Sequence, residues 1–216
     1  MIVSNFAVIE GCDGSGTTTQ LKQLKKNFSL QNISKNTGFF VTGEPTRGPL
    51  GLMIRKILMG KISVQKETLA RLFAADRGEH LYAPGGIIER CGRNELVVSD
   101  RYTPSSLVYQ GLDCGRELPE TLNAAFPHPE LLIYLDLDTG IVMERIAKRK
   151  EKREIYEYME FQAKVREAYL ELLPIYEQAG VRVICLDGSG TPEELAIEIW
   201  SKVMEMPIME KVKKNR

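Results

Sequence analysis

Short apolar runs alternate with longer segments of mixed polarity along the chain. The apolar runs, such as FAVIE and LLIYLD, lie at residues 6–10, 39–43, 96–100, 131–136 and 181–187. Each has the length of a buried strand, and the segments between them have the length of amphipathic helices. We expect helices at residues 17–30, 49–59, 66–91, 103–110, 139–152, 155–179 and 192–205. Strands that alternate with helices predict a mostly parallel sheet that is buried on both faces, so the expected fold class is α/β.

Two of the predicted helices carry signals that refine their limits. Pro84 has no amide proton to donate and clashes with the preceding turn, so the helix predicted at residues 66–91 breaks or bends there. The stretch TPEEL places Thr191 at an N-cap, Pro192 at the first helical position and Glu194 at the capping-box position. This stretch therefore marks a helix start.

Length and composition indicate one folded domain. The chain has 216 residues, of which 43% are hydrophobic and 27% are charged, as in ordinary globular proteins. We expect a single domain at residues 1–208, followed by a loosely held basic tail, MEKVKKNR, at residues 209–216.

Charge and hydropathy exclude several classes of partner. The 29 basic and 29 acidic side chains cancel, so no global field holds the chain on nucleic acid or on an anionic membrane. No apolar run approaches the roughly 20 residues that span a bilayer, and MIVSNFAVIEG lacks the layout of a signal peptide. We therefore expect a cytoplasmic protein in which any anion site is built locally.

The stretch EGCDGSGTTTQ, residues 10–20, places three glycines between a predicted strand and a predicted helix. In the pattern G-x-x-x-x-G-K-[ST], backbone amides of such a loop and of the helix N-terminus converge on phosphate oxygens. Thr18 stands where the hydroxyl that ligates magnesium is expected, but Thr17 replaces the lysine. The alternative is that the glycines only make a tight turn. The predicted nucleotide-binding residues are Gly11, Cys12, Asp13, Gly14, Ser15, Gly16, Thr17, Thr18 and Thr19.

The cysteines and histidines do not indicate a zinc site. There is no C-x-x-C pair, and His80 and His128 are too few and too far apart to bind a metal together from one helix. Any metal is expected to arrive with a substrate. Cys12 lies inside the predicted anion loop, where amide dipoles could lower its pKa, or it is a spacer. All four cysteines are expected to be reduced thiols: Cys12, Cys91, Cys114 and Cys185.

Five segments in chain order resemble the thymidylate kinases, the enzymes that phosphorylate thymidine monophosphate with ATP. They are EGxDGxGxxTQ, TGEPTRGPLGLMIRKIL (42–58), LARLFAADRGEHL (69–81), SDRYTPSSLVYQG (99–111), and PELLIYLDL together with KRKEKREIYE. The resemblance runs from about residue 6 to about residue 200. It implies a P-loop NTPase three-layer sandwich whose five-stranded parallel sheet has the order 2-3-1-4-5, with helices on both faces and a lid at about 145–156. It also implies magnesium with ATP, and a homodimer.

The resemblance assigns roles to acceptor residues. Phe73 would stack on the thymine ring, and Arg77, one helical turn later, would hydrogen-bond the base. Core packing is the alternative for Phe73. Asp13 would face the acceptor sugar, and Tyr109 would crowd its 2′ position. The predicted substrate-binding residues are Asp13, Glu44, Pro45, Phe73, Arg77, Arg101, Ser105, Ser106, Tyr109 and Gln110.

Asp100 and Arg101, in the stretch SDRY, lie at the end of a predicted buried strand. Open α/β sheets bind their ligands outside the carboxyl ends of their strands. Asp100 could hold magnesium together with Thr18, and Arg101 could grip the acceptor phosphate with its planar fork. A structural ion pair between Asp100 and Arg101 is the alternative.

The phosphate loop holds no arginine, so the chain resembles family members whose catalytic arginine comes from the lid. The segment KRKEKRE offers Arg149 and Arg153, although a solvated, charged helix end has the same composition. The predicted catalytic residues are Asp100, Arg101, Arg149 and Arg153.

Thr17 leaves three functions open. A charge about 4 Å from a phosphate contributes roughly 4 kcal/mol at an effective dielectric near 20, or about three decades of rate. Lys22 or Lys66 could supply that charge, and every other motif is intact. The sequence therefore favours an active thymidylate kinase. The alternatives are a catalytically silent nucleotide-binding module and a kinase for another nucleoside monophosphate.

Overall fold

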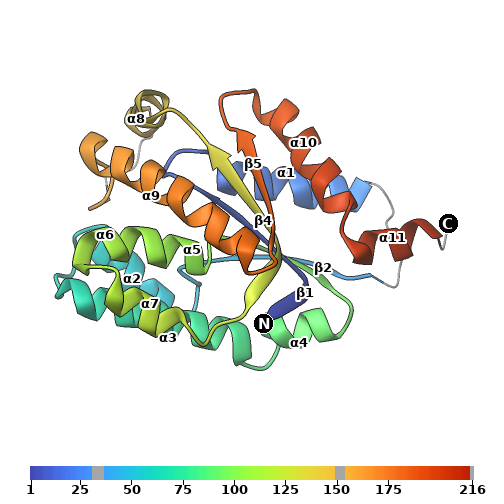
Figure 1. Cartoon of the computed structure of the whole chain (residues 1–216), viewed down its shortest axis with the longest axis horizontal. Coiled ribbons are helices and arrows are strands. Elements are labelled where there is room, and N and C mark those ends of the chain that lie inside the picture. The colour runs from blue at the N-terminus through green and yellow to red at the C-terminus, as the bar shows by residue number, and fades with distance from the viewer. Residues whose placement is uncertain (31–36, 149–153, 215–216) are drawn as a thin grey trace.

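The structure is a computed structural model that describes residues 1–30, 37–148 and 154–214. At its centre lies a five-stranded sheet whose paired strands are all parallel, in the order β2-β3-β1-β4-β5 (Figure 1). The α/β class and the strand order are therefore confirmed. The strands are β1 (Ile2–Gly11), β2 (Phe39–Gly43), β3 (Leu96–Asp100), β4 (His128–Asp136) and β5 (Arg182–Asp187).

The sheet separates two apolar cores, which explains why its strands read as continuous apolar runs. Along β1, Phe6 and Val8 belong to one core, and Ala7 and Ile9 belong to the other. Because successive side chains of a strand point to opposite faces, a strand that is covered on both sides needs apolar residues at every position.

Helices cover both faces. The core beside Ala7 and Ile9 is closed by α1 (Thr17–Leu30) and α10 (Pro192–Met204), which contact each other. The opposite core is closed mainly by α2 (Pro49–Leu58), α3 (Lys66–Tyr82) and α9 (Met159–Gln178). The shorter helical segments are α4 (Ile87–Gly92), α5 (Thr103–Ser105), a π-helical turn η1 (Ser106–Gln110), α6 (Gly111–Cys114), α7 (Glu117–Asn123) and α8 (Thr139–Ala147).

The predicted helix limits hold at Pro84 and Thr191 and fail near the lid. The helix predicted at 66–91 is divided by Pro84 into α3 and α4, and Thr191 forms the expected capping box with Glu194. The helix predicted at 155–179 begins only at Met159. The preceding residues are held instead by tertiary contacts, since Ile155 donates a backbone hydrogen bond to Leu58 and Tyr156 is buried.

The C-terminal segment is not separate from the domain. Helix α11 (Pro207–Lys214) crosses the boundary expected at residue 208, and Met206, Ile208 and Met209 are buried in the core beneath α1 and α10. The expectation of a loosely held tail from residue 209 is wrong at Met209, because this apolar side chain packs into the core.

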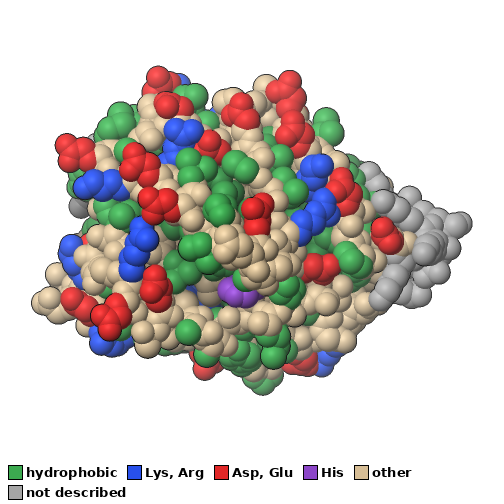
Figure 2. Space-filling model, in the orientation of Figure 1, with side chains coloured by type: hydrophobic (Ala, Val, Ile, Leu, Met, Phe, Trp, Pro, Cys, Tyr) green, Lys and Arg blue, Asp and Glu red, His purple; other side chains and the backbone are tan. Residues whose placement is uncertain are grey.

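The surface carries charges of both signs. Figure 2 shows acidic and basic side chains interspersed over the face of Figure 1, without a gathering of either sign. No helix in the described ranges is both long enough and apolar enough to traverse a lipid bilayer.

Candidate active site

A large cavity opens where the strands β1, β2 and β3 end. In the sheet register Asp100 lies opposite both Ile9 and Gly43, so the loop after β1, the turn after β2 and the Asp100–Arg101 pair meet at one edge. The cavity has a volume of about 1620 Å³, and its walls combine the glycine-rich loop with the predicted acceptor residues. This position, outside the carboxyl ends of parallel strands, is where open α/β sheets bind ligands.

The glycine-rich loop is shaped by its main chain. Gly14 and Gly16 have φ angles of +87° and +99°, a region that side chains with a Cβ rarely occupy. The Ser15 amide donates to the Cys12 carbonyl over 3.0 Å, and α1 begins directly after Gly16. The loop therefore directs the N-terminus of a helix into the cavity, which is the geometry of a phosphate site.

Not every predicted loop residue lines the cavity. Asp13 and residues 14–19 do so, whereas Gly11 and Cys12 are not among its described lining residues. Cys12 is buried with its Sγ 3.9 Å from the hydroxyl of Tyr134, and burial raises its pKa to about 11. The interpretation of Cys12 as a spacer is therefore supported, and the alternative of a lowered pKa is not.

Thr17 lines the cavity with a side chain that is 7% exposed. Of the two lysines considered as replacements, only Lys22 lines the cavity. Lys66 lies 2.7 Å from Asp113, outside the described lining, so it is not placed to serve the loop. Arg47, Arg55, Arg145 and Lys25, none of which the sequence analysis singled out, also line the cavity.

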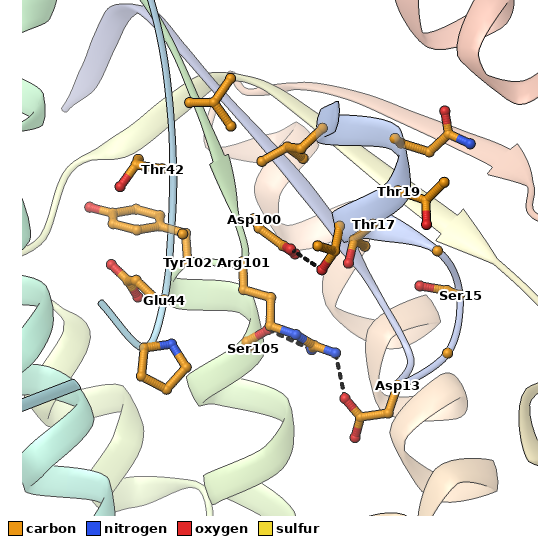
Figure 3. Close-up of a pocket in the computed structure, with 18 of the residues that line it drawn as sticks. Asp13, Ser15, Thr17, Thr19, Thr42, Glu44, Asp100, Arg101, Tyr102 and Ser105 are labelled. Atoms are coloured by element: carbon orange, nitrogen blue, oxygen red, sulfur yellow. Dashed lines mark hydrogen bonds and ion pairs between the residues drawn. The ribbon is translucent and has the colours of Figure 1, made fainter. Parts of the chain in front are cut away.

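Thr18 and Asp100 are brought together as predicted. The Thr18 hydroxyl donates to Asp100 Oδ2 over 2.7 Å, a contact drawn in Figure 3. Asp100 Oδ1 is buried and makes no hydrogen bond within the described part of the chain. Magnesium prefers oxygen ligands and commonly takes only one or two from the protein, so this pair fits a magnesium site.

Arg101 reaches from the end of β3 toward the loop (Figure 3). Its Nη2 donates to Asp13 Oδ1 over 2.7 Å, and its Nη1 donates to the hydroxyl of Ser105 over 3.1 Å. Because Asp100 and Arg101 engage different partners, the reading of a structural ion pair between them is wrong. Arg101 also has a φ of +69°, and a non-glycine residue in this conformation is typically retained at functional sites.

Asp13 is fixed from a second direction by Gln162 on α9. Gln162 Nε2 donates to Asp13 Oδ2 over 3.0 Å, and its Oε1 accepts from the Asp13 amide over 3.2 Å. Gln162 Nε2 also donates to the carbonyl of Tyr156, at the end of the predicted lid. Gln162 thus links the loop to the lid region, a role that its place in an amphipathic helix does not reveal.

Glu10, at the end of β1, holds the segment that follows β3. Its carboxylate is fully buried and accepts hydrogen bonds from the Tyr102 amide, the Ser105 hydroxyl and the Tyr169 hydroxyl at 2.7–2.8 Å. Burial raises the pKa of Glu10, while the charge of Arg101 and these hydrogen bonds oppose the rise. The available signal was a charged residue ending the apolar run FAVIE.

Glu44 and Arg77 form a buried ion pair on the acceptor side. Arg77 is 1% exposed, and its Nε and Nη2 donate to Glu44 Oε2 over 2.9 and 2.6 Å. Arg77 also donates to the Tyr102 carbonyl, to Ser106 and to Asn123. Both ion-pair residues line the cavity, so the fixed Arg77 side chain forms part of its wall.

The other predicted acceptor residues fall into two groups. Pro45, Phe73, Ser105, Tyr109 and Gln110 line the cavity. Phe73 also packs against the apolar core, so both readings of it apply. Ser106 lies behind Arg77, whose hydrogen bond it accepts, and it is not among the described lining residues.

The turn that carries Arg47 is fixed by hydrogen bonds to Asp76 and by close packing against α2. Asp76 accepts hydrogen bonds from the amide and the hydroxyl of Thr46 at 2.7 and 2.6 Å. A Cβ at Gly51 would lie 2.1 Å from the Thr46 carbonyl, so only glycine allows α2 to approach this turn. A signal for Arg47 existed, because it follows the predicted residues Glu44 and Pro45 in EPTRG.

Arg149 and Arg153, the predicted catalytic residues of the lid, lie outside the described residues. On either side of them, Arg145 and Glu154 line the cavity. Burial and the nearby charge of Asp13 raise the pKa of Glu154.

Comparisons with known proteins point to one family over most of the chain. The family model described as thymidylate kinase matches residues 9–199. The chain is 42% identical over 168 residues to a protein of Treponema pallidum (strain Nichols) named "Putative thymidylate kinase", with 78% of each chain covered. It is 38% identical over 194 residues to a protein of the same name from Aeropyrum pernix, which covers 89% of this chain and 90% of that one.

A solved structure adds the fold. The chain matches a thymidylate kinase from Candida albicans with a TM-score of 0.71, over 95% of this chain and 93% of that chain, at 22% identity. The identity in that pair is low, so the likeness shows a shared fold alone. The family model and the two sequence relatives carry the assignment: the chain belongs to the thymidylate kinase family.

Proposed function

We propose that this chain transfers the γ-phosphoryl group of ATP to thymidine monophosphate, with release of ADP and thymidine diphosphate. The observation that carries the proposal is a single cavity whose walls join the phosphate loop to Phe73, Arg77 and Arg101. Its volume of about 1620 Å³ exceeds the roughly 300–1,000 Å³ of a pocket for one small ligand, which suits two nucleotides. Family membership supports the same reaction.

On the acceptor side, the roles follow from the placement of the side chains. Arg101 would exchange its contact with Asp13 for the acceptor phosphate, which its planar fork matches. Phe73 would stack on the base beside the edge of Arg77, and Tyr109 would lie against the sugar. Arg47 and Arg55 add positive charge to the same cavity.

On the donor side, the loop amides and the start of α1 would hold the phosphates of ATP. Thr18 and Asp100 would hold magnesium, which neutralises charge on phosphate oxygens when bound. Arg149 and Arg153 are proposed to bring further positive charge from the lid, on the strength of the resemblance to the family. Phosphoryl transfer depends mainly on positioning and on such charge, so the chain's own residues do little covalent work.

Measurement of ADP release tests this proposal. Purified protein with magnesium and ATP should release ADP faster with thymidine monophosphate than with the monophosphates of deoxyuridine, uridine or cytidine. Arg101→Met should lower this rate at least about tenfold, because it removes a charged hydrogen-bond donor from the acceptor phosphate. The variant also shows that the measured ADP comes from this cavity.

The loss of the loop lysine favours one competing function, a silent nucleotide-binding module. Tight ATP binding without turnover of any acceptor would establish that function instead. Faster turnover of another monophosphate would identify the chain as a kinase with a different acceptor.

We also propose a homodimer that acts in the cytoplasm. The dimer is supported by the resemblance to the family, and light scattering on purified protein tests it. The cytoplasm is supported by the four free cysteines, which are typical of a reducing compartment. Fractionation of cells that contain the protein tests this location.

A further inference from the structure

His80 lies directly behind the acceptor side of the cavity. It is on α3, three residues after Arg77, so both side chains project from the same face of the helix. Its Nδ1 lies 3.1 Å from Glu44 Oε1, and its Nε2 lies 2.6 Å from the hydroxyl of Thr42.

The direction of the Glu44 contact does not depend on the protonation state of His80. A carboxylate paired with an arginine accepts hydrogen bonds and donates none, so Nδ1 must carry the proton that is shared with Glu44. In the neutral ring Nε2 then accepts from the Thr42 hydroxyl, and in the charged ring it donates to that oxygen. In either state His80 holds Oε1 while Arg77 holds Oε2.

The side chain of His80 is 8% exposed, so it makes these two contacts in a largely buried place. It is not among the described residues that line the main cavity, but it lines a second hollow of about 300 Å³ on its other side. Since Glu44 is 7% exposed and has His80 as the partner of its Oε1, loss of His80 would leave a buried carboxylate oxygen without that donor.

We propose that His80 is a positioning residue for recognition of the acceptor base, acting through Glu44 on Arg77. Glu44 is fixed at one oxygen by His80 and therefore presents the other in a fixed direction. Arg77 aligns on that oxygen with two donors, which helps to set the direction of its guanidinium in the cavity wall that it shares with Phe73. The inference rests on the proposed function, because it takes the acceptor to be the nucleotide bound at this edge.

A matched pair of substitutions separates the two contacts of His80. In His80→Asn the side-chain amide nitrogen takes the place of Nδ1, so the donor to Glu44 is kept and the contact with Thr42 is lost. In His80→Gln the amide nitrogen takes the place of Nε2, so the contact with Thr42 is kept and the donor to Glu44 is lost. Each variant removes one hydrogen bond, and His80→Gln is expected to lower the Tm more, because it leaves a buried carboxylate oxygen without its donor.

The readouts are the KM and the calorimetric Kd for thymidine monophosphate, with the KM for ATP as the internal control. We expect His80→Gln to raise both acceptor constants about three- to tenfold, and His80→Asn to leave both close to wild type. The KM for ATP should be unchanged in both variants. In a Glu44→Gln background, His80→Gln should cause little further change, because the two residues act in series.

The inference would be overturned if the two variants had equal KM and Kd for thymidine monophosphate, or if the effects of Glu44→Gln and His80→Gln were additive. His80 would then have a structural role alone. The calorimetric readout does not require turnover. A wild-type protein that binds no thymidine monophosphate would overturn the proposed function together with this inference, whereas binding that is the same in all proteins would overturn this inference alone.

Discussion

The two sides of the cavity are built by different means. On the acceptor side, side chains fix other side chains: Glu44 is held by Arg77 and His80, and Arg77 in turn contacts Ser106 and Asn123. On the phosphate-loop side, the path of the loop comes mainly from the main chain, through glycines at positive φ and the start of α1, while Arg101 and Gln162 hold Asp13. The Ser15 hydroxyl is buried there and makes no hydrogen bond in the described ranges.

This difference shows why the chain can depart from the loop pattern at one position. A threonine in place of lysine removes a charge, but the path of the backbone depends on the glycines, and these are present. Replacement of a charged residue by a neutral one on the acceptor side, at Arg77 or Glu44, would leave the other member of a buried ion pair without its partner. Substitutions should therefore affect folding on the acceptor side and the rate of the reaction on the loop side.

Arg77→Met is expected to have the largest effect, on stability. Among the described residues it leaves the buried carboxylate of Glu44 with His80 as its one side-chain partner, and loss of one member of a buried pair costs about 3–5 kcal/mol. Denaturant unfolding should show this loss. Arg71→Met, on the exposed surface of the same helix, is the matched control and should change the free energy of unfolding by less than about 0.5 kcal/mol. Equal free energies of unfolding for the two variants would contradict the conclusion that buried side-chain pairs on the acceptor side stabilise the fold.

Thr17→Lys should act on the rate and leave folding alone. The new ammonium group would enter the cavity beside the donor phosphates and raise kcat, up to a limit of about three decades from one charge about 4 Å away. Thr17→Met adds similar length without charge and should not raise kcat. Steady-state kinetics and the Tm of both variants provide the measurement. A fall in kcat for Thr17→Lys would show that the loop is rebuilt around threonine.

The sequence predicted where the strands and helices lie along the chain better than it predicted which of them lie side by side in the fold. Apolar runs locate the strands because a sheet that is covered on both faces needs them, and Pro84 and Thr191 mark helix ends by local chemistry. Strand order came only from the resemblance to the family, since an apolar run carries no mark of which strand lies beside it.

At the site, residue types were predictable and their partners were not. Glu44 and Arg77 were both expected at the acceptor, but their pairing joins positions 33 residues apart. Gln162 was missed because a polar residue is ordinary in an amphipathic helix, and Glu10 was missed although a charge at the end of the apolar run FAVIE was a signal. The start of α9 was placed too early, since burial of Tyr156 depends on contacts with distant segments.

Glu10→Gln should change stability less than Arg77→Met, and the pH dependence of this change has a definite sign. Burial raises the pKa of its carboxyl in the folded protein above the ordinary value of 4.5. Between those two pKa values the folded state binds more protons than the unfolded state, so this group's contribution to stability falls as pH rises. The stability of Glu10→Gln relative to wild type should therefore increase from pH 4 to pH 7, as thermal unfolding at several pH values would show.

Glu194→Gln is the control of opposite sign. Backbone and side-chain hydrogen bonds from Thr191 lower the pKa of Glu194, so its contribution is present above pH 4.5 and is lost as pH falls. The stability of this variant relative to wild type should decrease from pH 4 to pH 7. A Glu10→Gln profile that runs parallel to that of Glu194→Gln would contradict the buried position of Glu10.

Cys12 provides the smallest expected effect and tests the loop side most directly. If the main chain alone forms the anion site, the side chains of the loop can face away from it, as Cys12 does toward Tyr134. With a pKa of about 11, roughly one Cys12 thiol in ten thousand is ionised at pH 7, and burial hinders its access to reagents. Iodoacetamide should therefore label the exposed Cys185 first and leave Cys12 unmodified in the folded protein, as peptide mass spectrometry would show. Rapid labelling of Cys12 that ATP suppresses would place the thiol inside the phosphate site, and side chains would then shape both halves of the cavity.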